Sequence, residues 1–416
     1  MKNKIILLSI FLISLISNAQ RTLTLGECYN LVEKNYPLAK QVGLLEQRSS
    51  SEIEAINKGK LPKVDLNAQA TYQSEVIGLP MALPGIEQAN KDQYRATLDV
   101  NQLIYNGGII EANAKLKQAQ TKTQQQQVTL NLYGLQNRIN HYFFSILLLQ
   151  QKKELLLSKD DLLFSKIKEV KVGVKYGALL PTSELVLEAE RFKIKQQLTE
   201  IKFENNKMLE NLSQLTNSII DDKTVLLTPP FLLNTGNRLR PELAFYDLQN
   251  EQIESSKNVL AKSNLPKVFA FGQAGYGNPG LNMLDNSFHS FYIVGLKTSW
   301  NVFDWGKMNK DKQTLDIAQE IVQTEKETFE LNNKIELQQL DNEIKKIQQL
   351  LESDIEIIQI YEKIVKSSDA QMKNGVITTS EYLTDVIRLF EAKNSLAQHQ
   401  VGLSLAQHNY QTILGN

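Results

Sequence analysis

The feature that most constrains the fold is that the chain repeats itself. The sequence Leu-Pro-Lys-Val at 61–64 returns at 265–268, about 200 residues later, and Pro37 is matched by Pro241 at the same offset. Ile-Tyr-Asn-Gly at 104–107 is echoed by Phe-Asp-Trp-Gly at 303–306. This period is far longer than the units of about 20–50 residues from which solenoids are built. We therefore expect two similar halves, residues 20–220 and 221–416, that together form one domain.

The first nineteen residues are expected to be a secretory signal peptide. Lys2 and Lys4 precede an apolar run from Ile5 to Ile16, and Ala19 ends a small-residue cleavage site. The rest of the chain is close to electrically neutral, which argues against nucleic acid as the main partner. The single cysteine, Cys28, has no partner for an intramolecular disulfide and is interpreted as a small buried apolar residue. Because the later apolar runs are too short for a spanning helix, a membrane form would require β-strands.

Each half is expected to open with a helix, over 25–60 and 241–263, that stops before Leu-Pro. Two strands of about ten residues follow each helix, because apolar and polar side chains then alternate with a period of two. The aromatic ends of the apolar faces are typical of a membrane interface. They are Tyr72, Tyr94, Tyr276, Tyr292 and Trp300.

The remainder is predicted to be long helix. From Ile109 to Val172 there is no proline, and apolar residues recur every seven positions from Leu135 to Val170. The second half repeats this pattern around Ile344 to Val365, and return helices are expected over 182–216 and 379–414. A period of about 3.5 residues sustained over this length indicates coiled-coil packing.

Four strands cannot close a barrel, so their edges would lie in lipid with unpaired backbone groups. Three copies would supply twelve strands and leave no edge. The predicted fold class is therefore a mixed α/β membrane protein: a trimeric 12-stranded β-barrel, four strands per chain, continued by a long coiled-coil α-helical barrel, with an internal two-fold repeat.

The chain resembles the outer-membrane efflux protein family, the TolC-like channels, along its whole predicted mature length. The resemblance rests on the doubled order helix–strand–strand–helix–helix, on the two Leu-Pro-Lys-Val segments, and on the Gly-containing segments after the second strand of each half. It implies a homotrimeric exit channel of a tripartite efflux or type I secretion system, in the outer membrane with a periplasmic helical extension. Its implied partners are outer-membrane lipid, a periplasmic adaptor (membrane fusion protein) and, through the adaptor, an RND, ABC or MFS inner-membrane pump. No cofactor is implied.

Several sites are expected from these patterns. Glycines at the strand-to-helix junctions would allow a sharp turn, and polar residues on the inward strand face would line the barrel lumen. The two helical-hairpin ends combine a glycine, aliphatic residues and a Ser/Thr–Glu cap, and their apolar side chains are candidates for adaptor docking. Acids near these ends are candidates for a ring at the periplasmic aperture, with helix capping as the plainer interpretation. The residues are Gly107, Gly108 and Gly306 for the junctions; Arg95, Asp99 and Lys297 for the lumen; Gly177, Ala178, Leu179, Leu180, Gly375, Val376 and Ile377 for docking; and Glu381, Asp385 and Glu184 for the aperture.

An enzyme is not expected. The four histidines are spread along the chain, and no phosphate loop, nucleophile elbow or cysteine pair is present. Two other classes remain open, an exported coiled-coil scaffold and a periplasmic adaptor. Neither has a use for two pairs of amphipathic strands with aromatic ends, which is the feature that favours a channel.

Overall fold

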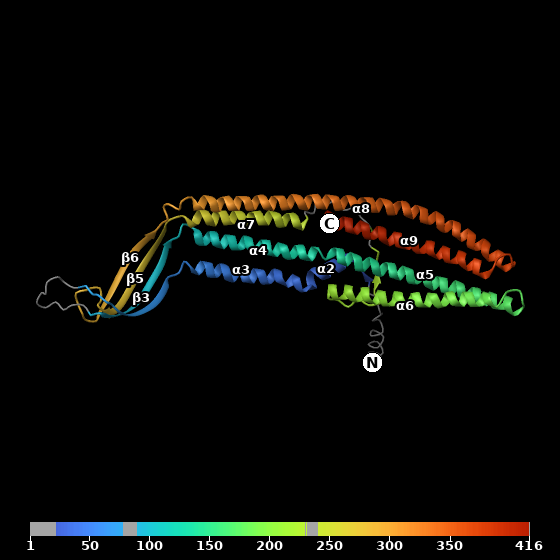
Figure 1. Ribbon diagram of the computed structural model, residues 1–416, viewed down its shortest axis with the longest axis horizontal. Helices are drawn as coiled ribbons and strands as arrows, with labels where there is room; N and C mark the ends of the chain where they lie inside the picture. The colour runs from blue at the N-terminus through green and yellow to red at the C-terminus, as the bar shows by residue number, and fades with distance from the viewer. Residues whose placement is uncertain (1–21, 78–89, 229, 231–239, 416) are drawn as a thin grey trace, which may run out of the picture. The chain divides into compact units, whose positions relative to one another are not determined.

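The computed structural model describes residues 22–77, 90–228, 230 and 240–415 (Figure 1). The expected signal peptide lies outside the described residues. The chain divides into two compact units, one made of Met1–Lys40, Val128–Glu242 and Thr328–Asn416, the other of Gln41–Gln127 and Leu243–Glu327. The order helix, two strands, long helix, return helix occurs in both halves of the chain.

The second unit contains a four-stranded antiparallel sheet. Its strands are β2 (Lys63–Tyr72), β3 (Asp92–Tyr105), β5 (Lys267–Asn278) and β6 (His289–Ser299). They are ordered β2-β3-β5-β6, so the hairpin of the first half lies beside the hairpin of the second. The strand predictions are confirmed in both halves. The sheet is open, with β2 and β6 as its edges.

The strand register pairs apolar residues with apolar residues and polar residues with polar residues. Leu66 pairs with Leu98 and Ala68 with Ala96, whereas Asn67 pairs with Thr97. The same alternation continues from β3 into β5, where Leu98 pairs with Ala274 and Asp99 with Gln273. One face of the sheet is therefore apolar and the other largely polar. A one-residue slip would reverse the two faces, which is why this register is strongly specified.

Four helical segments of the second unit lie side by side: α3 (Lys40–Lys58), α4 (Ile109–Tyr133), α7 (Pro241–Ser263) and the first part of α8 (Lys307–Lys373) (Figure 1). Ion pairs link each neighbouring pair: Lys117 with Glu52, Lys122 with Glu251, and Lys257 with Asp316. These surfaces are mostly polar, as the sequence pattern indicated.

The first unit holds the hydrophobic cores. Helix α5 (Gln136–Lys175) packs against α6 (Thr182–Thr216) and α9 (Thr379–Leu414), and α2 (Leu25–Asn35) packs against α5 and α6. Short strands β1 (Thr22–Leu23) and β4 (Val225–Leu226) pair beside α2. Cys28 is fully buried in this core, in agreement with its interpretation as an apolar residue. The two return helices begin and end where the sequence predicted.

Two helix predictions are wrong in detail. The opening helix over 25–60 is interrupted after Asn35, because Tyr36 is extended and the next residue, Pro37, begins a short 3-10 turn, Pro37–Ala39. The residue before a proline is disfavoured in the helical region. The long helix from Ile109 also divides, with Gly134 and Leu135 separating α4 from α5. Glycine inside a helix is entropically costly, and here it marks the break.

Candidate functional site

The apolar face of the sheet is largely exposed. Leu66 is 78% exposed, and Val294 and Leu296 are each 75% exposed. Near the loop end of the strands, the ring of Phe288 stacks between Tyr94 and Tyr276. A contiguous exposed apolar surface of this kind marks contact with a membrane or another protein.

The opposite face carries all three predicted lumen residues, and one of them, Asp99, lies in a polar network. Asp99 accepts hydrogen bonds from Asn67 (2.6 Å), Thr97 (3.0 Å) and Gln273. The guanidinium of Arg95 lies 5.5 Å from the centre of the Phe291 ring. Lys297, on β6, pairs in the register with Phe269. The three predicted residues thus share one face of the sheet but not one cluster.

Phenylalanines also occupy this face, which sequence alternation alone did not explain. Phe291 lies over Gly275 and Phe271 over Gly295, each on the neighbouring strand. A Cβ at Gly275 would come within 2.4 Å of the Phe291 ring, and one at Gly295 within 2.9 Å of the Phe271 ring. Each glycine therefore makes room for an aromatic ring, which pins the β5–β6 register.

The strand-to-helix junctions are tight turns held by one side chain each. Asn106 accepts a hydrogen bond from the Gly108 amide (2.8 Å), and Asp304 accepts from the Gly306 amide (2.9 Å) and from the Met308 amide (2.9 Å). Gly107, Gly108 and Gly306 all have positive φ, as the predicted sharp turn requires. Trp305 also has positive φ, which sequence reasoning did not foresee.

At the two hairpin ends, only part of the predicted docking set is exposed. Gly177 and Gly375 have positive φ and end α5 and α8. Leu180 is 72% and Val376 70% exposed, and Ala178 is exposed as well. Leu179 and Ile377 instead pack against a buried cluster drawn from both hairpins, which we call the hairpin core. Its members are Leu163, Ile167, Val170, Leu187, Ile194, Met372, Tyr382, Leu383 and Val386.

The capping prediction is right for one hairpin and wrong for the other. Thr378 and Glu381 form a complete capping box at the start of α9, with the Thr378 amide donating to Glu381 (2.7 Å). This backbone hydrogen bond, followed by the one from the Thr378 hydroxyl, holds the pKa of Glu381 below its usual range. At α6 the N-cap is Pro181, which makes no side-chain cap hydrogen bond. Proline favours the first turn of a helix, so Thr182 is already inside it.

The other two predicted aperture acids have partners in the same chain. Glu184 pairs with Lys171 at 2.9 Å, between α6 and α5. Asp385 accepts a hydrogen bond from Ser368 on α8 and lies 3.8 Å from Arg388. The structure thus places all three acids beside the hairpin ends, each in contact with a local partner.

A buried charge cluster next to these residues was missed from the sequence. Lys166 on α5 bonds to Asp369 on α8 and to Glu169 (2.6 Å), and its ammonium lies 5.3 Å from the Tyr382 ring centre. Burial on its own would lower the pKa of Lys166, but these hydrogen bonds raise it above its usual value. Likewise, burial of Asp369 is outweighed by hydrogen bonds from Lys166 and Lys373, so its pKa is lowered. The cluster joins the first hairpin to the second.

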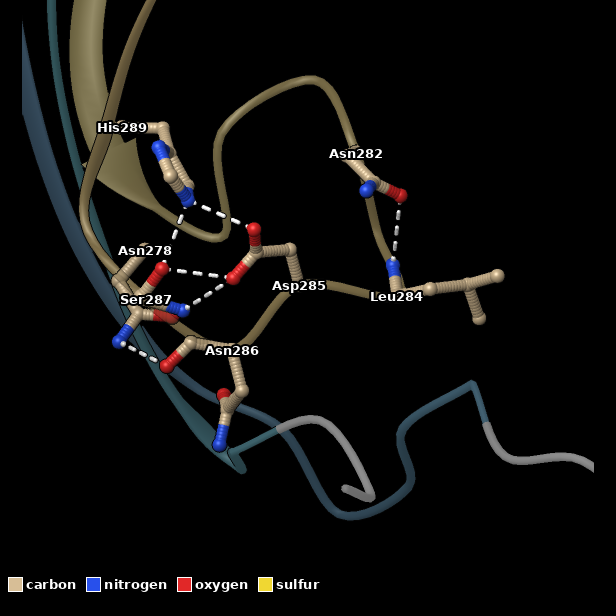
Figure 2. A network of polar contacts seen from close by, with 7 residues as sticks. All are labelled: Asn278, Asn282, Leu284, Asp285, Asn286, Ser287 and His289. Carbon is tan, nitrogen blue, oxygen red and sulfur yellow. Dashed lines mark hydrogen bonds and ion pairs between the residues drawn. The ribbon is translucent and has the colours of Figure 1, made fainter. Parts of the chain in front are cut away.

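A serine, a histidine and an aspartate meet in the loop between β5 and β6 (Figure 2). His289 Nε2 lies 2.7 Å from Ser287 Oγ and 2.7 Å from Asp285 Oδ2. A catalytic triad needs the two ring nitrogens for the two partners, one each. Because the same nitrogen faces both partners, and Ser287 also bonds Asp285 directly (2.6 Å), this network orders the loop. The hydrogen bond from Ser287, then the one from His289, lowers the pKa of Asp285.

Two kinds of feature are absent from the described residues. In that part of the chain, no three His, Cys, Asp or Glu side chains gather where they could hold a metal ion. None of its helices has a stretch long and apolar enough to cross a membrane.

Comparison with known proteins identifies the fold through structure. No protein-family model matches the sequence, and no curated protein matches it. Solved structures do match. The outer membrane channel CmeC of Campylobacter jejuni has a TM-score of 0.67 at 14% identity, covering 94% of this chain and 85% of its own. The outer membrane protein VceC of Vibrio cholerae has a TM-score of 0.67 at 14% identity, with 94% and 96% covered. The Neisseria gonorrhoeae outer membrane channel MtrE, solved in its open state, has a TM-score of 0.69 at 12% identity, with 94% and 89% covered. The chain therefore has the fold of the TolC-like outer-membrane channels.

Proposed function

We propose that this chain is one subunit of a homotrimeric outer-membrane exit channel in a tripartite efflux or type I secretion system. It conducts passively what a periplasmic adaptor and an inner-membrane pump of the RND, ABC or MFS type hand over. The single observation that carries the proposal is an open, amphipathic sheet whose exposed face is apolar. The fold shared with solved outer membrane channels supports it.

The sheet by itself has no favourable surroundings, either in water or in lipid. Its apolar face needs lipid, and in lipid the unpaired N–H and C=O groups of edge strands β2 and β6 would each cost several kcal/mol, on the order of the penalty for any buried unpaired polar group. Pairing β6 of one copy with β2 of the next removes these edges. Three copies then give twelve strands and a closed barrel, with the helical hairpins in the periplasm.

In such a barrel the polar face lines the pore. Arg95, Asp99 and Lys297 then lie along the conduction path, with Asp99 held by its hydrogen-bond network. Side chains of both charges are represented, so this set of residues favours neither cations nor anions.

The hairpin ends are proposed as the adaptor contact. Leu180 and Val376 are exposed aliphatic side chains that the fold itself does not use. Leu179 and Ile377 hold the ends onto the hairpin core instead. Glu381, Asp385 and Glu184 are proposed to lie around the periplasmic aperture when three copies assemble, where the capping box keeps Glu381 ionised.

Disulfide trapping tests the trimer. Cys28 is the only cysteine and is buried, so a Cys28→Ala background is free of thiols. Asn67→Cys on β2 is combined in turn with Lys297→Cys and Ile293→Cys on β6, positions that already carry a Cβ on the polar face. Oxidation in native membranes is expected to give dimers and trimers on a denaturing gel. The control pair, Asn67→Cys with Thr97→Cys, faces itself within one chain and should give monomers only.

A product ladder that continues beyond three subunits, or monomers from every β2–β6 pair, would contradict a closed trimer. Monomers in the soluble periplasmic fraction would instead favour the exported coiled-coil scaffold or adaptor.

Export tests the docking surface. Leu180→Asp with Val376→Asp is expected to abolish export of a pump substrate while trimers still form. Leu179→Asp is the contrasting variant, because it places a charge against the hairpin core and should reduce the amount of folded protein. Normal export by the first double variant would refute the proposed docking surface.

A further inference from the structure

Apolar side chains form a line across the otherwise polar face of the sheet. Leu103 on β3 pairs with Phe269 on β5, which marks one end of the line. Residues that pair directly, or that lie two apart on one strand, point to the same face. The line therefore continues over β5 and β6 along the strands, for about 20 Å. We call it the apolar track, and its residues are Leu103, Phe269, Phe271, Ile293 and Phe291.

The strand register accounts for only part of this track. Phe271 and Phe291 each lie over a glycine of the neighbouring strand, which makes room for the ring. Phe269 and Ile293 instead face polar side chains. Phe269 is half-buried and Ile293 is 36% exposed, so both leave apolar surface open on a face that is otherwise polar. Contacts within the chain therefore do not explain why these two residues are apolar.

Both acids that the strands place on this face are engaged within the sheet. Asp65 pairs with Lys63 at 3.2 Å. Asp99 accepts its hydrogen bonds from the three donors already described, Asn67, Thr97 and Gln273. Their charges are thus partly neutralised by local partners.

The cations beside the track are less engaged. Arg95 lies over the ring of Phe291 at one end of the track, and Lys297 is opposite Phe269 at the other. Neither cation forms an ion pair with a carboxylate in the part of the chain that the structure describes. As a set the lumen residues favour neither sign, but those that adjoin the track without an ionic partner are positive.

We propose that the apolar track binds passing cargo that combines a flat apolar ring with a negative charge, such as an aromatic sulfonate or carboxylate. This rests on the proposed function, in which the polar face lines a pore. The track removes the apolar part of the cargo from water, and aromatic rings add stacking contacts. Arg95 and Lys297 attract the charge, and a guanidinium also stacks on rings. A cationic or purely polar molecule gains less from these contacts.

Thiol modification in native membranes tests the proposal. In the Cys28→Ala background, Ile293→Cys places a thiol within the track and Val294→Cys places one on the apolar face. Water-soluble methanethiosulfonates that carry an anionic or a cationic group modify each thiol, and every rate is divided by that of the same reagent with free 2-mercaptoethanol. The protecting probe is 2-naphthalenesulfonate. Its controls are methanesulfonate, which has no ring, and 2-naphthyltrimethylammonium, which is a cation.

The Ile293→Cys thiol is expected to react faster with the anionic reagent. The naphthalenesulfonate should slow its modification at least about threefold more than either control compound does, since only this probe offers both a ring and a negative charge. Phe269→Thr and, separately, Arg95→Gln should remove most of this protection. Gln69→Thr lies on the same face but outside the track, and it should leave the protection unchanged. Arg95→Gln keeps every track residue, so it tests the charge even if Phe269→Thr does not assemble.

The inference is overturned if the naphthalenesulfonate gives no protection, if the aromatic cation protects equally, or if protection survives Arg95→Gln. The proposed function still stands in those cases when the thiol at position 293 reacts rapidly and the thiol at position 294 slowly, because water then fills one face of the sheet and lipid covers the other. Equally fast reaction at both positions would show that the sheet does not separate a pore from lipid, and both proposals would fail.

Discussion

Replacing Gly107 by alanine should be the most damaging single-methyl change at the strand-to-helix junctions. Gly107 has a φ of 67°, and an added Cβ would meet the Leu265 Cβ at 2.5 Å. The left-handed backbone alone costs an L-residue about 1–2 kcal/mol. The contact adds about 1–3 kcal/mol of overpacking, since a Cβ is fixed to the backbone and cannot swing away.

The neighbouring glycine is a matched control. Gly108 also has positive φ (81°), but its added Cβ would lie 3.9 Å from the Lys262 side chain, an ordinary contact. Gly306, with a φ of 76°, has nothing within 4 Å. Both alanine variants should therefore lose only the backbone part, about 1–2 kcal/mol. The free energy of unfolding is measured by guanidinium titration in detergent, followed by tryptophan fluorescence.

The partner of the overlap can be tested as well. Leu265→Ala keeps the Cβ, so it should not rescue Gly107→Ala. Leu265→Gly removes that atom and should recover about 1–3 kcal/mol in a double-mutant cycle. Equal losses for the variants at Gly107 and Gly108, or rescue by Leu265→Ala, would refute the steric argument.

Three further outcomes follow from the hairpin ends. Thr378→Ala removes the cap of α9 and should lower the free energy of opening of its first turn by about 1 kcal/mol, seen as faster hydrogen exchange there. Thr182→Ala should leave exchange in α6 unchanged, because Thr182 is not a cap. Lys166→Met should destabilise the contact between α5 and α8 by about 1–3 kcal/mol, seen in the same exchange experiment, because Asp369 keeps only Lys373. Lowering the pH should loosen the hairpin ends, because the pKa values of Asp369 and Glu381 are depressed in the folded state. The stability that these two ionised carboxylates contribute is complete above their ordinary pKa values of 3.8 and 4.5, and it is lost as the pH falls through the folded values. Exchange rates that are flat between pH 6 and about pH 3 after correction for intrinsic chemistry would contradict this.

Much of the fold could be read from the sequence because its patterns are long. Ten-residue alternation places all four strands, and the bounds of α6 and α9 follow from the hairpin glycines and the periodic residues beyond them. Local breaks were harder. Pro37 was noticed as a marker of the repeat, yet its effect on Tyr36 is what ends α2. The sequence predicted one long helix from Ile109, and the structure shows that it divides at Gly134 and Leu135.

The candidate site was less predictable, because exposure depends on contacts between distant segments. Adjacent residues Leu179 and Leu180 look alike in the sequence, but one packs on the hairpin core and the other is exposed. The burial of Lys166 could have been predicted from its spacing. Lys159 lies seven residues earlier on the same helix face and is also buried, paired with Glu190 at 2.8 Å. Lysines at heptad spacing on an inward helix face indicate buried ion pairs, even when their partners cannot be named.

The two halves form the same turns with different residues, and these differences indicate which residues contact lipid or another protein. Gly107 must be glycine because Leu265 occupies the space beside it. The turns align one residue away from the sequence match, since Asn106 and Asp304 make the same hydrogen bond to the amide two residues on, so Trp305 holds the place of Gly107 and is largely exposed. A residue that the fold requires is explained by its neighbours in the chain. Trp305 has an unfavourable backbone and an exposed ring, so its neighbours do not explain it. The same reasoning separates Leu180 and Val376 from Leu179 at the hairpin ends. In the proposed channel, lipid would cover Trp305, and an adaptor would cover Leu180 and Val376. These contacts would explain the exposed side chains that contacts within the chain do not explain.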